Sequence, residues 1–344
     1  MLSLGAVLLS AKLISIPPHP PLHAGELLVA HGNRILRVDP DTGASAVFSP
    51  PLLGTNRIDQ FGTDAIAIDP DGDIFVVSND ELIRIDPVTG AQSEVHHVAC
   101  ALCVPVPGPI DVGVRPRGVD VAPDVLASLG DRRAIFVGAE DGVYTVRRDH
   151  GAVSSTLTWT DDDLDSASPV VAAAVVTDEA TALFLSDIGI GEAATSLFGS
   201  VLIELYDPGS VLSIDYGDGA LVYGLADSIC SAGGAGVWFG SDTAGVPISL
   251  AGYLRCPVGV AVDPLVPGRI WVADSNALGA TPRLIRLDYD GVDWHQSIFT
   301  DLPDGDVPHA IAVSPVSFAP EPSAEALGSG ALLLLAVRRL RSGR

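Results

Sequence analysis

Residues 63–95, TDAIAIDPDGDIFVVSNDELIRIDPVTGAQSEV, contain three short apolar runs separated by turn residues. The runs cover residues 65–68, 74–77 and 82–85, and two of them end in Asp-Pro turns that also contain Gly. Proline fixes φ and glycine accepts a positive φ, so both turns are sharp. Runs this short and rich in β-branched residues predict strands, and residues 92–95 supply a fourth. Four antiparallel strands make one blade-sized unit that cannot bury both its faces alone.

The unit recurs along the chain. Its first strand, an apolar triplet that ends near Pro, is repeated at residues 66–70, 119–123, 260–264 and 311–315, with a degenerate copy at 174–178. The last residues of these copies are separated by 53, 55, 86 and 51 positions. The interval of 86 suits two units, and a weaker unit beginning near Leu221 falls inside it. A period of about 40–50 residues is typical of a β-propeller.

The two ends of the chain complement each other. Residues 308–315 form a first strand with no blade after it, whereas residues 25–48 form a blade that lacks its first strand. We therefore expect an all-β, six-bladed β-propeller of four-stranded antiparallel blades, closed by N- and C-terminal strands that share one blade, plus a short C-terminal apolar helix. Closure in this way removes exposed sheet edges. After the shared blade, the others are expected to begin near Asp64, Gly118, Val171, Leu221 and Gly259.

Composition and charge agree with this class. The 344 residues are 47% apolar and 18% charged, with 36 Gly and 26 Pro, which suits an all-β chain with many turns. The formal net charge is −24. Such an acidic chain is a poor partner for nucleic acid or an anionic membrane surface.

Three segments divide the chain. Residues 1–24 are largely apolar and end in a Pro-rich run before Ala24, a pattern that predicts a secretory signal peptide, with a disordered leader as the alternative. Residues 25–316 form the propeller. Residues 317–344 contain Pro320-Glu321-Pro322, an apolar run of about 14 residues and a terminal Arg cluster. That run is short for a stable transmembrane helix.

The four cysteines form two pairs. Cys100 and Cys103 lie in a long insertion, and in an exported protein this spacing favours a small disulfide loop. A zinc site with His96 and His97, or a redox-active or free thiol pair, is the alternative. Cys230 is expected near the end of a first strand and Cys256 just before the next one. Those places lie on opposite faces of the ring, which argues against a bond between them.

Topology predicts where a ligand would bind. The loop into the first strand of a blade and the loop between its second and third strands emerge on the same face, around the mouth of the central channel. Candidate metal or ligand residues there are Asn79, Asp80, Glu140, Asp141, Asp187, Asp242 and Asp274. His31, Asn33, Asp64, Arg117, Arg255 and His309 are expected on the same face. Crowded carboxylates attract divalent cations such as Ca²⁺, whereas an Asp that hydrogen-bonds its own turn is the structural alternative.

The C-terminal segment resembles the PEP-CTERM sorting tail of Gram-negative bacteria. The Pro320-Glu321-Pro322 motif, the apolar run and the terminal Arg cluster occur in the order of that tail. The resemblance implies export, recognition by an exosortase-type processing enzyme, transient membrane contact through the tail, and release to the cell surface or extracellular matrix.

The repeat phrases resemble those of NHL-repeat and gluconolactonase-type six-bladed propellers, most closely at residues 259–264 and 270–275. The gluconolactonase resemblance implies a divalent metal held by a Glu, an Asn and an Asp at the channel mouth. Glu140, Asn79 and Asp274 lie in the corresponding region without matching a motif. His309 in Pro308-His309-Ala310-Ile311 resembles the His that precedes a first strand in streptogramin-lyase-like propellers.

Two functions are therefore expected. The first is a secreted or surface-sorted β-propeller that binds an unidentified surface or small-molecule ligand, or serves as a scaffold. The second is a divalent-metal-dependent lactonase or lyase, with His309 as the candidate catalytic residue. The chain has no nucleophile elbow, zinc-protease motif or dinucleotide fingerprint, so the first function is preferred.

Overall fold

The computed structural model describes residues 22–51, 58, 65–69, 72–78, 81–95, 118–121, 135–139, 142–149, 152–160, 174–176, 181–186, 189–196, 199–206, 211–217, 220–225, 235–240, 246–249, 254–275, 281–303 and 306–316. The strands in these ranges form four-stranded antiparallel sheets, and six such sheets are present. The predicted all-β propeller of four-stranded antiparallel blades is thereby confirmed.

We number the blades from the one that holds both ends. Blade 1 contains β24 (Pro308–Val313), β1 (Leu27–His31), β2 (Arg34–Val38) and β3 (Ser45–Ser49). Blade 2 contains β4 (Ala65–Ile68), β5 (Ile74–Ser78), β6 (Glu81–Ile85) and β7 (Gln92–Glu94). Blade 3 contains β8 (Gly118–Val121), β9 (Ile135–Ala139), β10 (Gly142–Asp149) and β11 (Ala152–Thr160).

The other three blades follow in chain order. Blade 4 contains β12 (Ala174–Val176), β13 (Thr181–Ser186), β14 (Gly189–Ser196) and β15 (Gly199–Tyr206). Blade 5 contains β16 (Val211–Gly217), β17 (Ala220–Leu225), β18 (Gly236–Gly240) and β19 (Val246–Pro247). Blade 6 contains β20 (Pro257–Val262), β21 (Arg269–Asp274), β22 (Arg283–Tyr289) and β23 (Trp294–Asp301).

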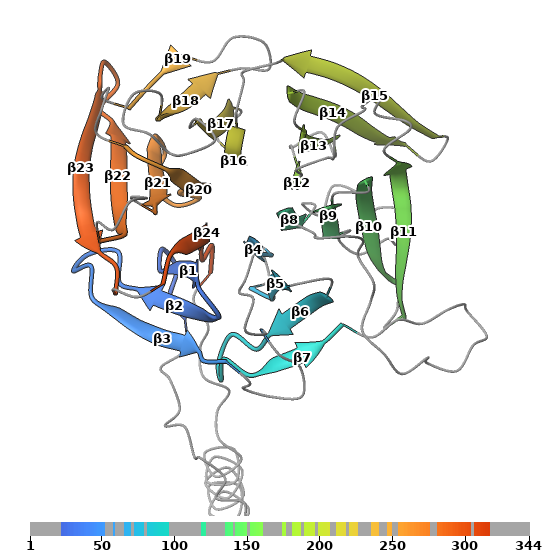
Figure 1. The fold of residues 1–344 in the computed structure, drawn as a ribbon, viewed down its shortest axis with the longest axis horizontal. Helices are drawn as coiled ribbons and strands as arrows, with labels where there is room; N and C mark the ends of the chain where they lie inside the picture. The colour runs from blue at the N-terminus through green and yellow to red at the C-terminus, as the bar shows by residue number, and fades with distance from the viewer. Residues whose placement is uncertain are drawn as a thin grey trace, which may run out of the picture.

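The blades are arranged as a ring around a central channel (Figure 1). Each innermost strand contacts the next in cyclic order, from β24 through β4, β8, β12, β16 and β20 back to β24. Blade 1 is completed by the last strand, because β24 pairs with β1 and brings Ile311 opposite Val29. The two ends of the propeller therefore share one sheet.

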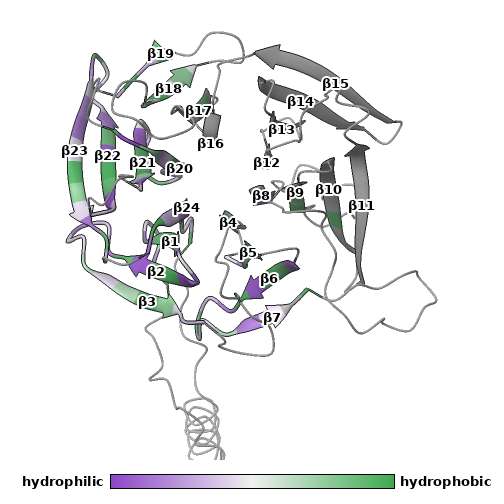
Figure 2. Cartoon of the chain, in the orientation of Figure 1, coloured by the Kyte–Doolittle hydropathy of each residue, from purple (hydrophilic) through white to green (hydrophobic). Residues whose placement is uncertain are grey.

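Apolar side chains fill the spaces between blades. In β5, Ile74 and Val76 pack toward blade 1, while Phe75 and Val77 pack toward blade 3. A strand buried on both faces has no polar side to present, which explains its unbroken apolar sequence. Similar cores are described between blades 5 and 6 and between blades 6 and 1. The outer strand β23 has a hydrophobic middle between hydrophilic ends (Figure 2).

The Asp-Pro turns are held by the Asp side chains. Asp86 Oδ1 accepts the backbone N–H groups of Val88 and Thr89 at 2.9 and 2.7 Å. Gly90 has φ +69° and lies so close to Phe48 that a Cβ would be 2.2 Å from the Phe48 carbonyl oxygen. The turn therefore needs glycine both for its conformation and for its contact with blade 1.

The expected start of blade 5 near Leu221 is wrong. Leu221 lies in the second strand, and the first strand is β16. β16 joins β17 through a short hairpin in which Gly217 pairs with Ala220, so the Asp-Pro signal that ends other first strands is missing. With the strands corrected, Cys230 falls between β17 and β18 in the sequence. The connection between the second and third strands of a blade belongs to the same face of the ring as the approach to β20.

Other sequence predictions lie outside the described residues: the Cys100–Cys103 loop, the C-terminal helix and the Pro320-Glu321-Pro322 motif. Within the described ranges, no helix is long and apolar enough to cross a membrane.

Candidate functional site at the mouth of the ring

The candidate residues divide into those that the structure describes and those that it does not. Asp274 and His309 are described, and so are His31, Arg34, Arg255 and Asp306 on the same face. The expected ligands Asn79, Asp80, Glu140, Asp141, Asp187 and Asp242 lie outside the described residues, as do Asp64 and Arg117. The site can therefore be built from blades 6 and 1. We call their shared face, which holds the β1–β2 hairpin and the approach to β24, the mouth face.

Asp274 ends β21 and is fully buried. Its Oδ1 accepts the backbone N–H groups of Cys256 at 2.7 Å and Arg255 at 3.2 Å. Its Oδ2 accepts Nε and Nη2 of Arg283, both at 3.1 Å. Both carboxylate oxygens thus bind protein donors, which come from two segments, and Asp274 links the approach to β20 to the start of β22.

His31 occupies the same position in blade 1. It ends β1, pairs with Arg34 at the start of β2 and faces Pro308 in β24, as Asp274 pairs with Arg283 and faces Pro257. His31 is also fully buried. Neither of its ring nitrogens has a hydrogen-bond partner. The closing blade therefore replaces a fully bonded carboxylate with an unpartnered imidazole.

A carboxylate does lie nearby, but it comes from another segment. Arg34 Nη2 donates to Asp306 Oδ2 at 3.0 Å, and Asp306 stands just before β24. Arg34 Nε is buried and has no partner. Gly32 has φ +57°, and a Cβ there would lie 2.7 Å from Asp306 Cγ. Glycine in the β1–β2 hairpin thus makes room for the Asp306 carboxylate.

The surroundings of His31 favour its neutral form. Burial lowers the pKa of His31 below its ordinary value of 6.5, and the positive charge of Arg34 lowers it further. Asp306 opposes this shift, and His309 adds to it. A neutral imidazole carries one N–H donor and one acceptor nitrogen, so the site offers both kinds of hydrogen bond at pH 7.

Among the described residues, no three His, Cys, Asp or Glu side chains are grouped to hold a metal ion. At the mouth, a cation would also meet the guanidinium of Arg34. Sequence reasoning placed His31 on this face but missed Arg34 and Asp306. A signal was available, because Arg34 and Arg283 both open a third strand directly after the mouth-face connection.

A second carboxylate lies on an innermost strand. Asp215 in β16 accepts the N–H of Val262 in the next blade at 2.6 Å and that of Tyr216 at 2.8 Å. Desolvation of its carboxyl group raises the pKa of Asp215 to about 6, although these hydrogen bonds oppose the shift. The equivalent residues in blades 6 and 1 are Ala261 and Ala312. Blade 3 has an acid at this position, Asp120, whose Oδ1 accepts the N–H of Val121 at 2.8 Å.

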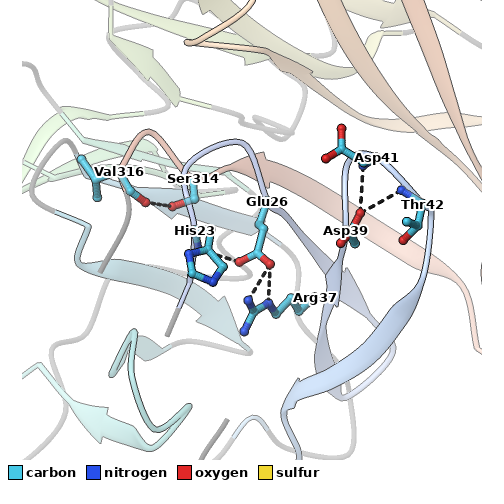
Figure 3. A network of polar contacts seen from close by, with 8 residues as sticks. All are labelled: His23, Glu26, Arg37, Asp39, Asp41, Thr42, Ser314 and Val316. Carbon is cyan, nitrogen blue, oxygen red and sulfur yellow. Dashed lines mark hydrogen bonds and ion pairs between the residues drawn. The ribbon is translucent and has the colours of Figure 1, made fainter. Parts of the chain in front are cut away.

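The opposite face carries a polar network near both ends of the propeller. Glu26 lies between the backbone of His23 and the guanidinium of Arg37 (Figure 3). The N–H of His23 donates to Glu26 Oε2 at 2.6 Å, and Arg37 Nε donates to Oε1 at 2.8 Å. Gly25 also bonds to Ser314. This network fixes the segment that leads into β1 and is remote from the mouth face.

Comparison with known proteins gives the fold and little more. No protein-family model matches the chain, and no curated protein matches it. TolB from Acinetobacter baumannii is 13% identical with a TM-score of 0.52, over 84% of this chain and 66% of that chain. A GH74 enzyme from Niastella koreensis is 16% identical with a TM-score of 0.48, over 82% of this chain and 47% of that chain.

A third structure, PQQ-bound aldose sugar dehydrogenase from Streptomyces coelicolor, is 15% identical with a TM-score of 0.48, over 86% of this chain and 90% of that chain. This chain spans about half the length of the GH74 enzyme. The likeness to TolB, at 13% identity, shows the β-propeller fold alone, because one propeller fold serves many unrelated functions.

Proposed function

We propose that this protein is an exported β-propeller that acts as a binding or scaffold module at the surface of a Gram-negative bacterium. The fold supplies a ring whose mouth face carries polar side chains from blades 6 and 1, among them His31, Arg34 and Asp274. The acidic charge of −24 makes nucleic acid a poor partner. The ligand is a surface component or a small molecule.

The observation that carries this preference over metal-dependent catalysis is the bonding of Asp274. Its two oxygens accept four hydrogen bonds, one pair from backbone N–H groups and the other from Arg283. A calcium ligand must direct a carboxylate oxygen at the ion, about 2.3–2.6 Å away. Asp274 could do so only by giving up bonds that hold blade 6 together.

Metal content of the full-length protein, purified without chelator, tests this proposal. We expect no stoichiometric divalent metal by mass spectrometry in the wild type. The Asp274→Ala variant should lose about 3 kcal/mol of unfolding free energy, because it removes the buried carboxylate that binds the largely buried Arg283 guanidinium. Arg84→Ala is the matched control, since it breaks a more exposed Arg–Asp pair at the opposite end of blade 2.

One tightly bound metal that disappears in Asp274→Ala would instead support the lactonase or lyase. In that case Glu140 and Asn79 would be the next residues to replace, and His309 the candidate base. Hydrolysis of a lactone panel by the wild type, lost in His309→Ala, would establish the enzyme. Neither result is expected if Asp274 only links the approach to β20 to the start of β22 through its hydrogen bonds.

We place export and sorting within the same proposal. The PEP-CTERM-like residues Pro320, Glu321 and Pro322 supply the motif for an exosortase-type enzyme, and the apolar run gives transient membrane contact. Mass spectrometry of the surface protein should find a C-terminus near this motif. Replacement of Glu321 by Ala should retain the tail, whereas recovery of the intact tail in the wild type would contradict sorting.

A further inference from the structure

The unpartnered imidazole of His31 requires an explanation. A buried polar atom without a hydrogen bond costs about 1–3 kcal/mol, and native proteins have few of them. His31 has two such atoms, and Arg34 Nε beside it is a third. Three unpartnered polar atoms therefore occur on two residues that face each other across the β1–β2 hairpin.

The repeats show that the fold does not require this arrangement. In blade 6 the same position holds Asp274, with both oxygens bonded, and its Arg283 has its carboxylate directly opposite. In blade 1 the carboxylate that binds the arginine comes from Asp306 instead, and the imidazole of His31 has no hydrogen bond. The blade that closes the ring thus lacks bonds that its neighbour has.

The donors and acceptors define what could complete the site. Arg34 Nε offers an N–H, and neutral His31 offers one N–H and one lone pair. An anion accepts hydrogen bonds only, so it would leave the His31 lone pair unsatisfied and would lie near Asp306. A cation would be repelled by Arg34. A hydroxyl group both donates and accepts, and two neighbouring hydroxyls satisfy all three atoms.

The ion pair beside His31 is weak. The side chains of Arg34 and Asp306 are 28% and 41% exposed. An ion pair with this exposure contributes at most about 1 kcal/mol. A ligand can therefore separate Arg34 from Asp306 at little cost, while Arg34 stays at the site and donates to the ligand through Nε.

We propose that His31 and Arg34 form a binding site for an uncharged polyhydroxyl compound, such as a saccharide, at the mouth of blade 1. Hydroxyl groups accept from Arg34 Nε and from the N–H of His31, and one donates to the other His31 nitrogen. His309, whose charge influences His31, borders the site on β24. This inference rests on the proposed binding function and names its ligand class.

The test measures binding to the full-length protein by calorimetry, together with the imidazole ¹⁵N shifts of His31. The probes are glucose, galactose, mannose and myo-inositol, with glucuronate and phosphate as anionic counterparts. We expect a neutral compound to shift the His31 resonances. Its affinity should fall about tenfold or more in His31→Leu and in Arg34→Lys, which keeps the positive charge but loses Nε–H.

His295→Leu is the matched control, because His295 is an exposed histidine paired with Asp290 in blade 6. It should bind as the wild type does. His31→Leu should also unfold at a higher urea concentration than the wild type, since it removes unpartnered polar atoms from a buried position. Loss of binding then cannot be attributed to loss of the fold.

Three results would overturn the proposal: no neutral probe that moves the His31 resonances, full affinity in His31→Leu, or tighter binding of glucuronate than of glucose. If a single ordered water bridges His31 and Arg34 and no probe shifts the His31 resonances, the first of these results applies and the proposal is wrong. These failures differ from failure of the proposed function, which would appear as a bound metal and lactone hydrolysis.

Discussion

At the scale of single residues, the two faces of the ring use Asp side chains for the same purpose. Asp86 in a turn and Asp274 at the mouth both bind backbone N–H groups, and both stabilise the approach to a neighbouring strand. At the equivalent place in blade 1, the ring nitrogens of His31 have no hydrogen-bond partner. The chemical difference between blades 1 and 6 therefore lies in one side chain and in the origin of one carboxylate.

Two residues give the unfolding free energy opposite pH dependences. The pKa of His31 is lowered in the folded protein, so its contribution to stability is complete above 6.5 and is lost as the pH falls. The pKa of Asp215 is raised from 3.8 to about 6, so its contribution is complete below 3.8 and is lost as the pH rises to about 6. Between pH 4 and 6 the two contributions oppose each other.

Urea unfolding from pH 4 to 8 separates the contributions of His31 and Asp215 to stability. Asp215→Ala, which restores the residue of blades 6 and 1, should make stability rise more steeply with pH between 4 and 6. His31→Leu should remove the loss on acidification below 6.5. Parallel curves for the wild type and both variants would contradict the assignment.

At the scale of elements, the repeat could be predicted from sequence where its turns contain Asp and Pro. Blades 1, 2 and 6 have these turns, and their strands were placed correctly. Blade 5 was misread because Gly217 and Ala220 close its first hairpin without that signal. The site was partly predictable: topology placed His31 and Asp274 on one face, but the pairing of Arg34 with Asp306 joins positions 272 residues apart.

The corrected blade 5 makes a prediction about the cysteines. Cys256 is disulfide-bonded, and its partner lies outside the described residues. Because the connection that contains Cys230 now belongs to the same face as Cys256, we expect these two to be joined. Peptide mapping without reduction should find a Cys230–Cys256 peptide. Cys230→Ser should lower stability by about 2–4 kcal/mol, whereas linkage of Cys256 to Cys100 or Cys103 would refute this pairing.

The segment before β1 is part of the folded structure. Leu22 is fully buried in the core between blades 1 and 2, although it precedes the expected start at residue 25. A chain that begins at residue 25 should be less stable than one that begins at 22, by about 2–3 kcal/mol for the buried leucine. Urea unfolding of the two chains tests this, and Leu22→Ala in the longer chain is the control.

The position of the mature N-terminus gives a second test of whether Leu22 is part of the folded protein. If Leu22 is retained in the exported protein, N-terminal sequencing will find cleavage before residue 22. Equal stability of both chains together with cleavage after Ala24 would show that the burial of Leu22 has no consequence.

At the scale of the whole molecule, closure of the ring depends on β24. Ile311 and Val313 of this strand are buried between blades 6 and 1. Removal of residues 308–344 should cost several kcal/mol, since each buried aliphatic side chain contributes about 1.5–3 kcal/mol, and should expose the edge of β1 to aggregation. Size-exclusion chromatography and urea unfolding measure both effects.

A chain that ends at residue 316 is the control and should behave as the intact ring does. A synthetic peptide of residues 306–316 should partly restore the shorter chain, because an added strand can pair with an open sheet edge. A monomeric and equally stable chain without β24 would show that the ring closes by other contacts.

The direction of β24 also determines the face of the ring from which the chain leaves the propeller. The strand enters at the mouth face, where Pro308 lies opposite His31, and leaves at the opposite face, where Ser314 bonds to Gly25 and Glu26. Whatever follows residue 316 therefore departs from the side remote from His31. If the C-terminal segment is held at a membrane, as we propose, this geometry turns the mouth of the ring outward, so that one strand determines which way the protein faces its surroundings.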